Sequence, residues 1–170
     1  MSTALDHTGN LIRLLLLFHL PLTLFSVHQF TLWHSPTAPS AISTLVLAVF
    51  AFLILSLLLP AYLLTRLFLT PSPKLYDATR TLLSLGPLYN LYGEGSQRYA
   101  AVLLGASLVV GVVIGAGQGS GTAQAVILLV VEIAVALVTS VWLPWGEGAS
   151  MGGTSFTLCV ARVVTMVLVL

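Results

Sequence analysis

The feature that most constrains this chain is an apolar stretch, residues 99–145, that contains a single charged residue, Glu132. An α-helix rises ~1.5 Å per residue, so about 20 residues span the ~30 Å hydrocarbon core of a bilayer. The stretch is therefore long enough for two crossings. It is interrupted by the small, polar residues 117–121, in which Gly117 and Gly121 predict a turn between two membrane helices. We expect a helical hairpin with a carboxylate inside the bilayer.

The whole chain has the composition of an integral membrane protein. Of its 170 residues, 58% are hydrophobic and 6% are charged, and the mean hydropathy is +1.05. A soluble domain of this size could not bury so much apolar surface. The six Lys and Arg residues are too few for a nucleic-acid-binding face. A single cysteine, Cys159, excludes an internal disulfide and a cysteine-based zinc site.

Hydropathy and flanking residues predict an all-α fold, a polytopic integral membrane helical bundle of about five transmembrane helices in one domain, residues 1–170. Pro21 interrupts the first segment, and Pro60 is expected to kink the second. The fifth segment is still apolar at Leu170, so we expect the chain to be truncated there. The predicted spans are residues 11–32, 41–69, 99–117, 122–143 and 151–170.

Basic residues predict how the chain is oriented in the membrane. Four of the six Lys and Arg residues lie in or beside the polar connection, residues 70–98. The positive-inside rule places this connection and the N-terminus in the cytosol, and the glycine turn on the lumenal or external side. Trp and Tyr residues near the predicted span ends agree with these boundaries, because such side chains favour the membrane interface.

Small residues repeat along the third predicted span. Ser107, Gly111, Gly115 and Gly119 recur every four residues. Such a stripe lets a neighbouring helix approach closely, so we predict that Gly111→Leu and Gly115→Leu disrupt helix assembly. The alternative is that glycine is simply frequent in membrane helices.

Two charges, Glu132 and Arg162, fall near the centres of the last two predicted spans. A charge at mid-bilayer costs roughly 2.5–3.5 kcal/mol on insertion scales, so each charge needs a partner or a function. In one interpretation the two helices are antiparallel neighbours and the charges pair. In the other, Glu132 lines a path for cations or protons and Arg162 tunes it. The further intramembrane polar residues, Gln118 and Gln124, are expected to solvate the exposed amides of the glycine turn.

Neither a catalytic set nor a metal site emerges from the sequence. The four histidines do not recur at helical spacing, and His19 and His28 fall on opposite helix faces. Ser120 does not stand in the Gly-x-Ser-x-Gly pattern of hydrolases, and residues 117–121 lack the lysine of a phosphate loop. We therefore expect no enzyme activity, no metal site and no bound cofactor.

The polar connection has an amphipathic part. Gly86 and Pro87 are expected to end a short helix that begins near Tyr76, and Tyr89 and Tyr92 to lie at the headgroup plane before the third span. This arrangement would form an interfacial elbow that passes tension or lipid signals to the hairpin. The alternative is an ordinary tyrosine-rich linker.

The same connection and the spans after it carry a set of motifs. These are residues 82–90 (LLSLGPLYN), Tyr92, residues 95–97 (GSQ), residues 114–121 (IGAGQGSG), Gln124 and Glu132. Together they resemble the fungal transient-receptor-potential-like membrane family, whose best-known branch is the flavin carrier proteins. The resemblance is most specific over residues 76–132.

The resemblance implies a multi-pass transporter or channel of the endoplasmic reticulum, Golgi or plasma membrane. FAD import into secretory compartments, calcium-permeable channel activity and cell-wall maintenance are implied with it. FAD or Ca²⁺ would be a transported species and not a cofactor, and the partners would be membrane lipids and other transmembrane helices or subunits. The family also has a signal peptide, a lumenal lipid-binding-like domain and further spans, so we expect this chain to be a fragment of the transmembrane region.

The transport path is expected near Glu132 and the glycine-lined face of the third span. The alternative function is a non-conducting membrane scaffold or lipid-sensing protein that supports trafficking and cell-wall maintenance.

Overall fold

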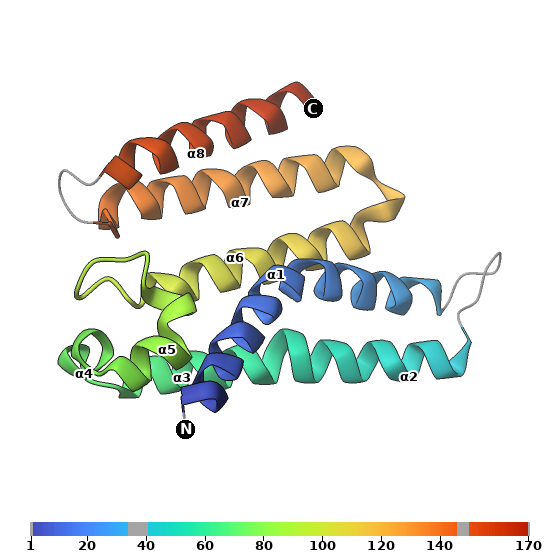
Figure 1. Cartoon of the computed structure of the whole chain (residues 1–170). Coiled ribbons are helices and arrows are strands. Elements are labelled where there is room, and N and C mark those ends of the chain that lie inside the picture. The colour runs from blue at the N-terminus through green and yellow to red at the C-terminus, as the bar shows by residue number, and fades with distance from the viewer. Residues whose placement is uncertain (1, 34–40, 146–149, 170) are drawn as a thin grey trace.

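The computed structural model describes residues 2–33, 41–145 and 150–169, and these residues form helices and turns without a β-strand. The prediction of an all-α polytopic bundle is confirmed, and the long helices run side by side (Figure 1). The elements are α1 (Ser2–Leu32), α2 (Ile42–Phe50), the π-helix η1 (Ala51–Leu58), α3 (Leu59–Leu69), α4 (Ser72–Asp77), α5 (Thr79–Tyr89), α6 (Tyr99–Ala116), the 3-10 turn η2 (Gly117–Gly119), α7 (Gly121–Trp142) and α8 (Ser150–Val169).

Among the residues that the structure describes, four helical segments are long and apolar enough to cross a membrane. They are His7–Leu32, Ile42–Leu69, Tyr99–Gly119 and Gly121–Trp142. The second of them joins α2, η1 and α3 into one continuous helical rod. A shorter apolar segment, Gly153–Thr165, belongs to α8, which packs along α7. The bundle therefore combines four candidate spans with a fifth, shorter apolar helix.

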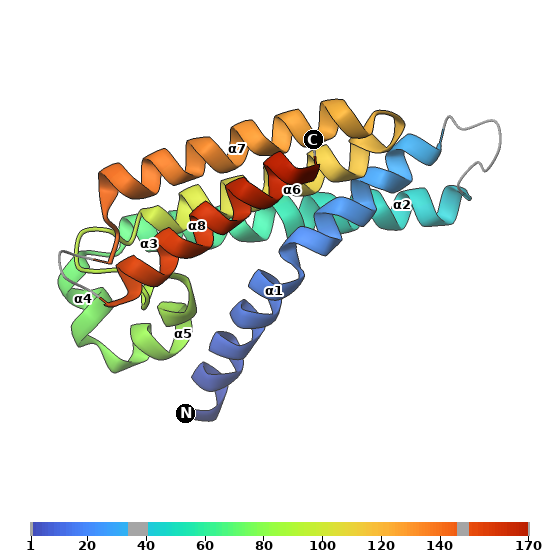
Figure 2. The ribbon, with the colours of Figure 1, turned by 90° about the horizontal axis from the view of Figure 1, so that it is seen from above.

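The helix α1 organises the bundle, because it packs against α2, η1, α5 and α6. Figures 1 and 2 show its N-terminal half set at an angle to the other long helices. Pro21 lies inside α1, where its missing N–H leaves the Leu17 carbonyl without its α-helical donor and favours a bend. The N-terminal half of α1 lies on α5, at the end of the bundle that holds residues 70–98. We call this the polar end.

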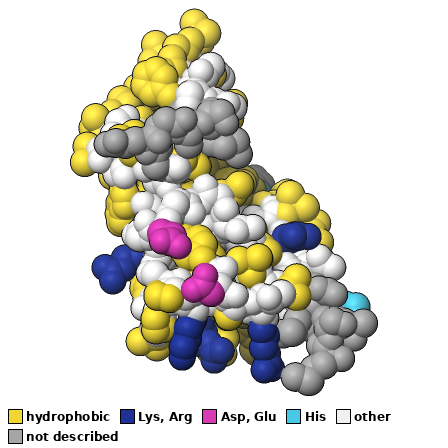
Figure 3. All heavy atoms as spheres, turned by 60° about the vertical axis from the view of Figure 1, so that its left-hand side comes forward, with side chains coloured by type: hydrophobic (Ala, Val, Ile, Leu, Met, Phe, Trp, Pro, Cys, Tyr) yellow, Lys and Arg dark blue, Asp and Glu magenta, His cyan; other side chains and the backbone are white. Residues whose placement is uncertain are grey.

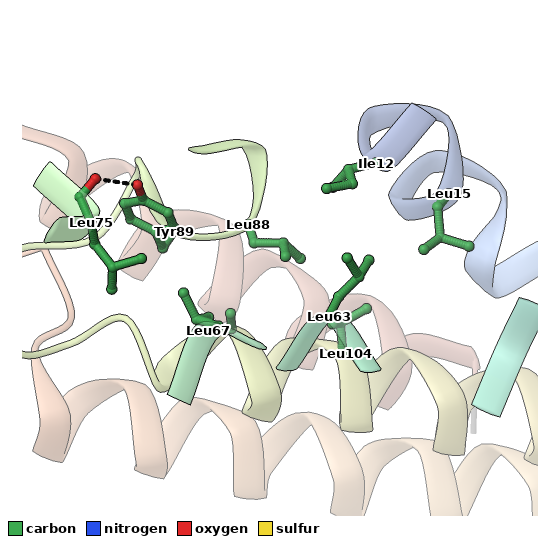
Figure 4. Packing of buried hydrophobic residues seen from close by; sticks show 9 residues of the cluster. Ile12, Leu15, Leu63, Leu67, Leu75, Leu88, Tyr89 and Leu104 are labelled. Carbon is green, nitrogen blue, oxygen red and sulfur yellow. Dashed lines mark hydrogen bonds between the residues drawn. The ribbon is translucent and has the colours of Figure 1, made fainter. Parts of the chain in front are cut away.

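Near the polar end, a hydrophobic core forms between α1, α3, α4, α5 and α6. Leu67, Leu75 and Tyr89 are fully buried there, and the Tyr89 hydroxyl donates a hydrogen bond to the Leu75 carbonyl (Figure 4). Many other large apolar side chains of the described helices are exposed, as expected for surfaces that face lipid. The core cluster comprises Ile12, Leu15, Leu63, Leu67, Leu75, Leu88, Tyr89, Ala100 and Leu104.

The prediction that Gly86 and Pro87 end a helix is wrong. The helix α5 continues through Pro87 to Tyr89, and the Tyr89 ring is buried in the core. Pro87 removes the α-helical donor to the Leu83 carbonyl. That carbonyl faces Gly9 of α1 so closely that a Cβ atom on Gly9 would lie 2.3 Å from the Leu83 oxygen. Close packing against α1 therefore accommodates the proline within the helix.

Candidate functional site

The helices α7 and α8 bring Glu132 and Arg162 together. The Arg162 Nη1 atom lies 3.9 Å from the Glu132 Oε2 atom, and the side chains are 66% and 14% exposed, respectively. This distance makes an ion pair without a short hydrogen bond. The pairing offsets part of the cost of a carboxylate inside a span. The arginine, which is the more exposed partner, has room to move away from the carboxylate.

A cavity of about 180 Å³ lies beside this ion pair, between α6, α7 and α8. Arg162 lines it together with Tyr99, Thr139 and Ser155. The hydroxyl groups of Tyr99 and Thr139 hydrogen-bond to each other across α6 and α7. Polar side chains from three helices therefore face one crevice, which we call the α6–α7–α8 crevice.

The glycine stripe of α6 lies against α1. A Cβ atom on Gly111 would lie 2.8 Å from the Thr23 Cβ atom, and one on Gly115 would lie 2.6 Å from the Leu24 carbonyl oxygen. Glycine at these two positions lets the backbones of α1 and α6 approach closely. The stripe ends there, because a Cβ atom on Gly119 would meet nothing within 4 Å.

This packing bears on the predicted transport path, which we expect near Glu132 and the glycine-lined face of the third span. Side chains of α1, including Thr23 and Val27, fill the space over Gly111 and Gly115. The Glu132 side chain instead lies where α7 meets α8. Its polar partner, Arg162, lines the α6–α7–α8 crevice and does not lie on the glycine face.

The hairpin turn lies at the end of the bundle opposite to the polar end (Figure 1). The Gln118 Nε2 atom donates a 2.7 Å hydrogen bond to the Ile114 carbonyl and so satisfies the last turn of α6. The Gln124 side chain packs over Gly117, where a Cβ atom would lie 3.2 Å from it. A Cβ atom on Gly121 would meet open space. The structure thus places these glutamines in the packing of the turn.

A buried polar cluster, absent from our sequence-based predictions, lies where α1, η1 and α6 meet. The His19 Nδ1 atom is 3.1 Å from the Ser107 Oγ atom, and the His19 Nε2 atom is 3.2 Å from the Ser56 carbonyl oxygen. The Thr23 hydroxyl donates to the His19 carbonyl at 2.7 Å and hydrogen-bonds the Ser56 hydroxyl at 2.9 Å. His19, Thr23 and Ser56 are almost completely buried. We call these four residues the His19 cluster.

Pro60 accounts for the bond between His19 and Ser56. In an α-helix the Ser56 carbonyl would accept a hydrogen bond from the N–H of residue 60, which proline lacks. The carbonyl can only accept, so the His19 Nε2 atom carries the proton, and in the neutral ring Nδ1 accepts from the Ser107 hydroxyl. The π-helical η1 lies directly before this interruption. Pro60 therefore leaves the Ser56 carbonyl free to accept a hydrogen bond from His19 of α1.

The sequence contains a signal for part of this cluster. His19, Thr23 and Ser26 are spaced four and three residues apart, so they share one face of a helix. All three are buried in the structure. Polar side chains on one face of a span indicate an interface with other helices. Which spans supply the partners, here Ser56 and Ser107, is not encoded in that spacing.

Aromatic side chains tie the polar connection to α6 and α7. The ring centroids of Tyr76 and Tyr89 are 5.4 Å apart, as are those of Tyr92 and Tyr99, and the Tyr99 ring also lies 6.2 Å from Trp142. The Tyr76 hydroxyl donates to the Tyr92 carbonyl at 3.2 Å. This connection is therefore a packed unit held by edge-to-face ring contacts.

We expect alkaline pH to destabilise this packed unit. Burial, and then the nearby Tyr99, raise the pKa of Tyr92 to about 12, and burial also raises the pKa values of Tyr76 and Tyr89. An unfolded tyrosine ionises near pH ~10, so the native state holds more protons than the unfolded state above that pH. The stabilisation is complete below pH ~10 and is lost as the pH rises towards about 12.

Thermal unfolding of the detergent-solubilised protein between pH 8 and 12 measures this effect. The melting temperature should fall above pH ~10, and Tyr92→Phe should make the fall shallower. The exposed Tyr62 provides a control, Tyr62→Phe, that should leave the profile unchanged. A melting temperature that is constant up to pH 12 would contradict the prediction.

Comparison with known proteins gives a family and a relative. The profile of the family described as "Transient receptor potential (TRP) ion channel" matches residues 7–170. An uncharacterized membrane protein of Schizosaccharomyces pombe is 26% identical over 163 residues, which cover 95% of this chain. The chain spans 18% of the length of that curated relative. No solved structure matches the chain.

Proposed function

Because the chain belongs to the transient receptor potential (TRP) ion channel family, we propose that it forms part of the membrane domain of a cation channel, with Ca²⁺ among the conducted ions. The observation that carries this proposal is the carboxylate of Glu132, which lies inside the α7 span and is only 14% exposed. Placing a carboxylate within a membrane span costs free energy, and a nearby cation reduces that cost. In this structure that cation is the guanidinium of Arg162.

The proposed path follows the α6–α7–α8 crevice. Arg162 and the hydroxyl groups of Tyr99 and Thr139 line the cavity there. When Arg162 swings away from Glu132, the carboxylate becomes available to a passing cation, and the hydroxyl groups offer further oxygen ligands. Membrane lipids and other transmembrane helices or subunits would surround this part of the bundle. Its place in the cell would be the endoplasmic reticulum, Golgi or plasma membrane.

FAD, as in the flavin carrier proteins, is the second candidate for the transported species. Its two phosphate groups are negative, so they would be attracted by the exposed guanidinium of Arg162 and repelled by Glu132. The two species therefore make opposite demands on the same ion pair. Glu132→Gln should impair cation conduction, whereas Arg162→Gln should impair FAD transport.

We expect Glu132→Gln to reduce the calcium conductance of the full-length protein by roughly tenfold, which corresponds to ~1.4 kcal/mol of lost attraction. Unitary currents in planar bilayers measure the conductance, and FAD uptake into proteoliposomes is measured on the same preparation. The matched control is Glu94→Gln, because Glu94 is exposed and lies outside the spans. A calcium current unaffected by Glu132→Gln would show that Glu132 has no role in cation conduction.

A charge exchange separates function from packing. The double variant Glu132→Arg, Arg162→Glu keeps the ion pair but places the carboxylate on α8. If the double variant folds like the wild type but does not conduct, the position of Glu132 matters for transport. If it both folds and conducts like the wild type, the ion pair is only structural.

A non-conducting scaffold or lipid-sensing protein, which supports trafficking and cell-wall maintenance, is the second candidate function. The observation that favours it is that the charge of Glu132 is already balanced by Arg162 and that α1 closes the glycine face of α6. Correctly inserted protein that carries neither current nor FAD would support this function.

A further inference from the structure

A groove of about 490 Å³ lies between α1, α3 and α5 near the polar end. Its volume is within the ~300–1,000 Å³ range of small-ligand sites. Arg66 from α3 and Arg80 from α5 both line it, and both side chains are exposed. The other polar side chains of the lining are hydroxyl groups, those of Tyr62, Thr8, Thr70, Thr81 and Ser84. The groove thus combines two permanent positive charges with several hydroxyl groups.

The charge of this groove is not balanced by the acidic residues that the structure describes. Among the acidic side chains that the structure describes, those of Asp77, Glu94 and Glu132, none places a carboxylate oxygen within 4.0 Å of the side-chain nitrogens of Arg66 or Arg80. Figure 3 shows Lys and Arg side chains along the lower edge of this face and others at its two sides, with Asp and Glu side chains above the lower edge. Two guanidinium groups in one groove without a neighbouring carboxylate favour an anionic ligand.

Local contacts hold the polar groups in place. The guanidinium carbon of Arg66 lies 6.0 Å from the centroid of the Tyr62 ring, within the range of a cation–π contact. The Thr70 hydroxyl donates to the Arg66 carbonyl at 2.7 Å, and the Ser84 hydroxyl donates to the Arg80 carbonyl at 3.0 Å. Each arginine therefore has a hydroxyl group four residues along the chain, and that hydroxyl donates to a bound oxyanion only when it gives up its bond to the backbone carbonyl.

The rest of the groove wall is apolar. Ile12, Leu63 and Leu85 line it, and the first two belong to the buried core. Further along α3, Phe68 and Leu69 are exposed apolar side chains outside the groove lining. The combination of a cationic part and an apolar part, at the end of two candidate spans, matches a lipid that has a negative headgroup and apolar chains.

We propose that this groove binds the phosphate headgroup of an anionic phospholipid, with a phosphomonoester preferred over a phosphodiester. A phosphomonoester carries about −1.5 to −2 charges at pH 7, which two arginines balance. Each guanidinium group also offers paired N–H donors that fit two phosphate oxygens. The proposal is independent of the conducted species, because the groove lies between α1, α3 and α5, away from the Glu132–Arg162 pair on α7 and α8.

The test measures binding of short-chain lipids to the purified full-length protein in neutral detergent by native mass spectrometry. Dioctanoyl phosphatidic acid is the probe, dioctanoyl phosphatidylcholine is the zwitterionic reference, and glycerol 3-phosphate is the soluble phosphate. We expect phosphatidic acid to bind at least tenfold more tightly than either of the others. Arg66→Gln and Arg80→Gln should each weaken its binding by roughly tenfold to a hundredfold, as expected for a lost charge-assisted contact.

The matched controls are Lys74→Gln and Arg98→Gln, which remove exposed positive charges near the same end but outside the groove. If these controls lose as much binding, the lipid is attracted by the general positive charge of this end and not by a specific site, which would overturn the proposal. Equally tight binding of glycerol 3-phosphate would identify a soluble phosphate as the ligand and overturn the lipid assignment. Unchanged phosphatidic acid binding in both arginine variants would show that the lipid does not bind in this groove and would also overturn the proposal.

Melting temperatures of the variants without lipid separate loss of binding from loss of folding. If either glutamine variant unfolds, the corresponding Arg66→Lys or Arg80→Lys variant keeps the charge but loses the paired donors, and its affinity should be intermediate. Wild-type affinity in the lysine variant would contradict the paired recognition of phosphate.

Discussion

Gly115→Leu is expected to separate α1 from α6 and to abolish the folded bundle in detergent. Even a single added Cβ atom at this position would lie 2.6 Å from the Leu24 carbonyl oxygen and 2.9 Å from the Val27 Cβ atom. Overpacking of a core usually costs ~1–3 kcal/mol when side chains can move aside. Here the nearest atom belongs to the backbone of a packed helix, so relief requires that the helices move apart. We therefore expect a cost above the upper end of that range.

The loss is measured as the fraction of monodisperse protein in size-exclusion chromatography and as the melting temperature. The matched controls are Gly105→Leu and Gly119→Leu, because a Cβ atom at either position meets nothing within 4 Å. These controls should change the free energy of unfolding by no more than ~0.5 kcal/mol. Equal damage by Gly119→Leu would show that the helix tolerates no large residue and that the α1 contact is not the cause.

His19→Leu should destabilise the bundle by roughly 1–3 kcal/mol, the cost of leaving buried polar groups without partners. The substitution removes the donor to the Ser56 carbonyl and the acceptor for the Ser107 hydroxyl. Hydrogen bonds between membrane helices contribute only ~0.6 kcal/mol on average, because separated helices find other partners. The expected loss in the free energy of unfolding is larger here because Pro60 has no N–H, so the Ser56 carbonyl lacks its usual donor within the helix.

A double-mutant cycle tests this explanation. Pro60→Ala supplies an N–H that can donate to the Ser56 carbonyl, so His19→Leu should cost less in that background than in the wild type. The matched control is His28→Leu, because the buried Nδ1 atom of His28 has no hydrogen-bond partner among the described residues. That control should be nearly neutral. Equal costs of His19→Leu in both backgrounds would show that Pro60 is not coupled to His19.

The four long apolar helices could be predicted from the sequence because each one is a property of a single segment. The stretch of residues 99–145 is too apolar and too long for one crossing, and the structure divides it into α6 and α7 with the turn at residues 117–119. Proline was less informative, because its effect depends on its neighbours. Pro87 lies within α5, where α1 packs closely against the turn that lacks a hydrogen bond.

For the candidate sites, too, the sequence revealed properties of single segments but not the contacts between segments. Glu132 and Arg162 stood out because a charge within an apolar segment is visible in that segment alone, and their 3.9 Å separation follows from the packing of adjacent helices. The spacing of Gly111 and Gly115 indicated a close helix contact but not its partner. The structure places α1 there, which closes the face along which a path was expected.

The sequence by itself determined the all-α membrane architecture and the position of Glu132 within an apolar helix, because hydropathy and length act within one helix. Only the tertiary structure decided which helix faces meet. His19 reaches Ser56 across 37 residues and Ser107 across 88 residues of sequence. Such contacts depend on the shapes and polar groups of two surfaces that are brought together in folding, and the spacing within either helix does not specify the other.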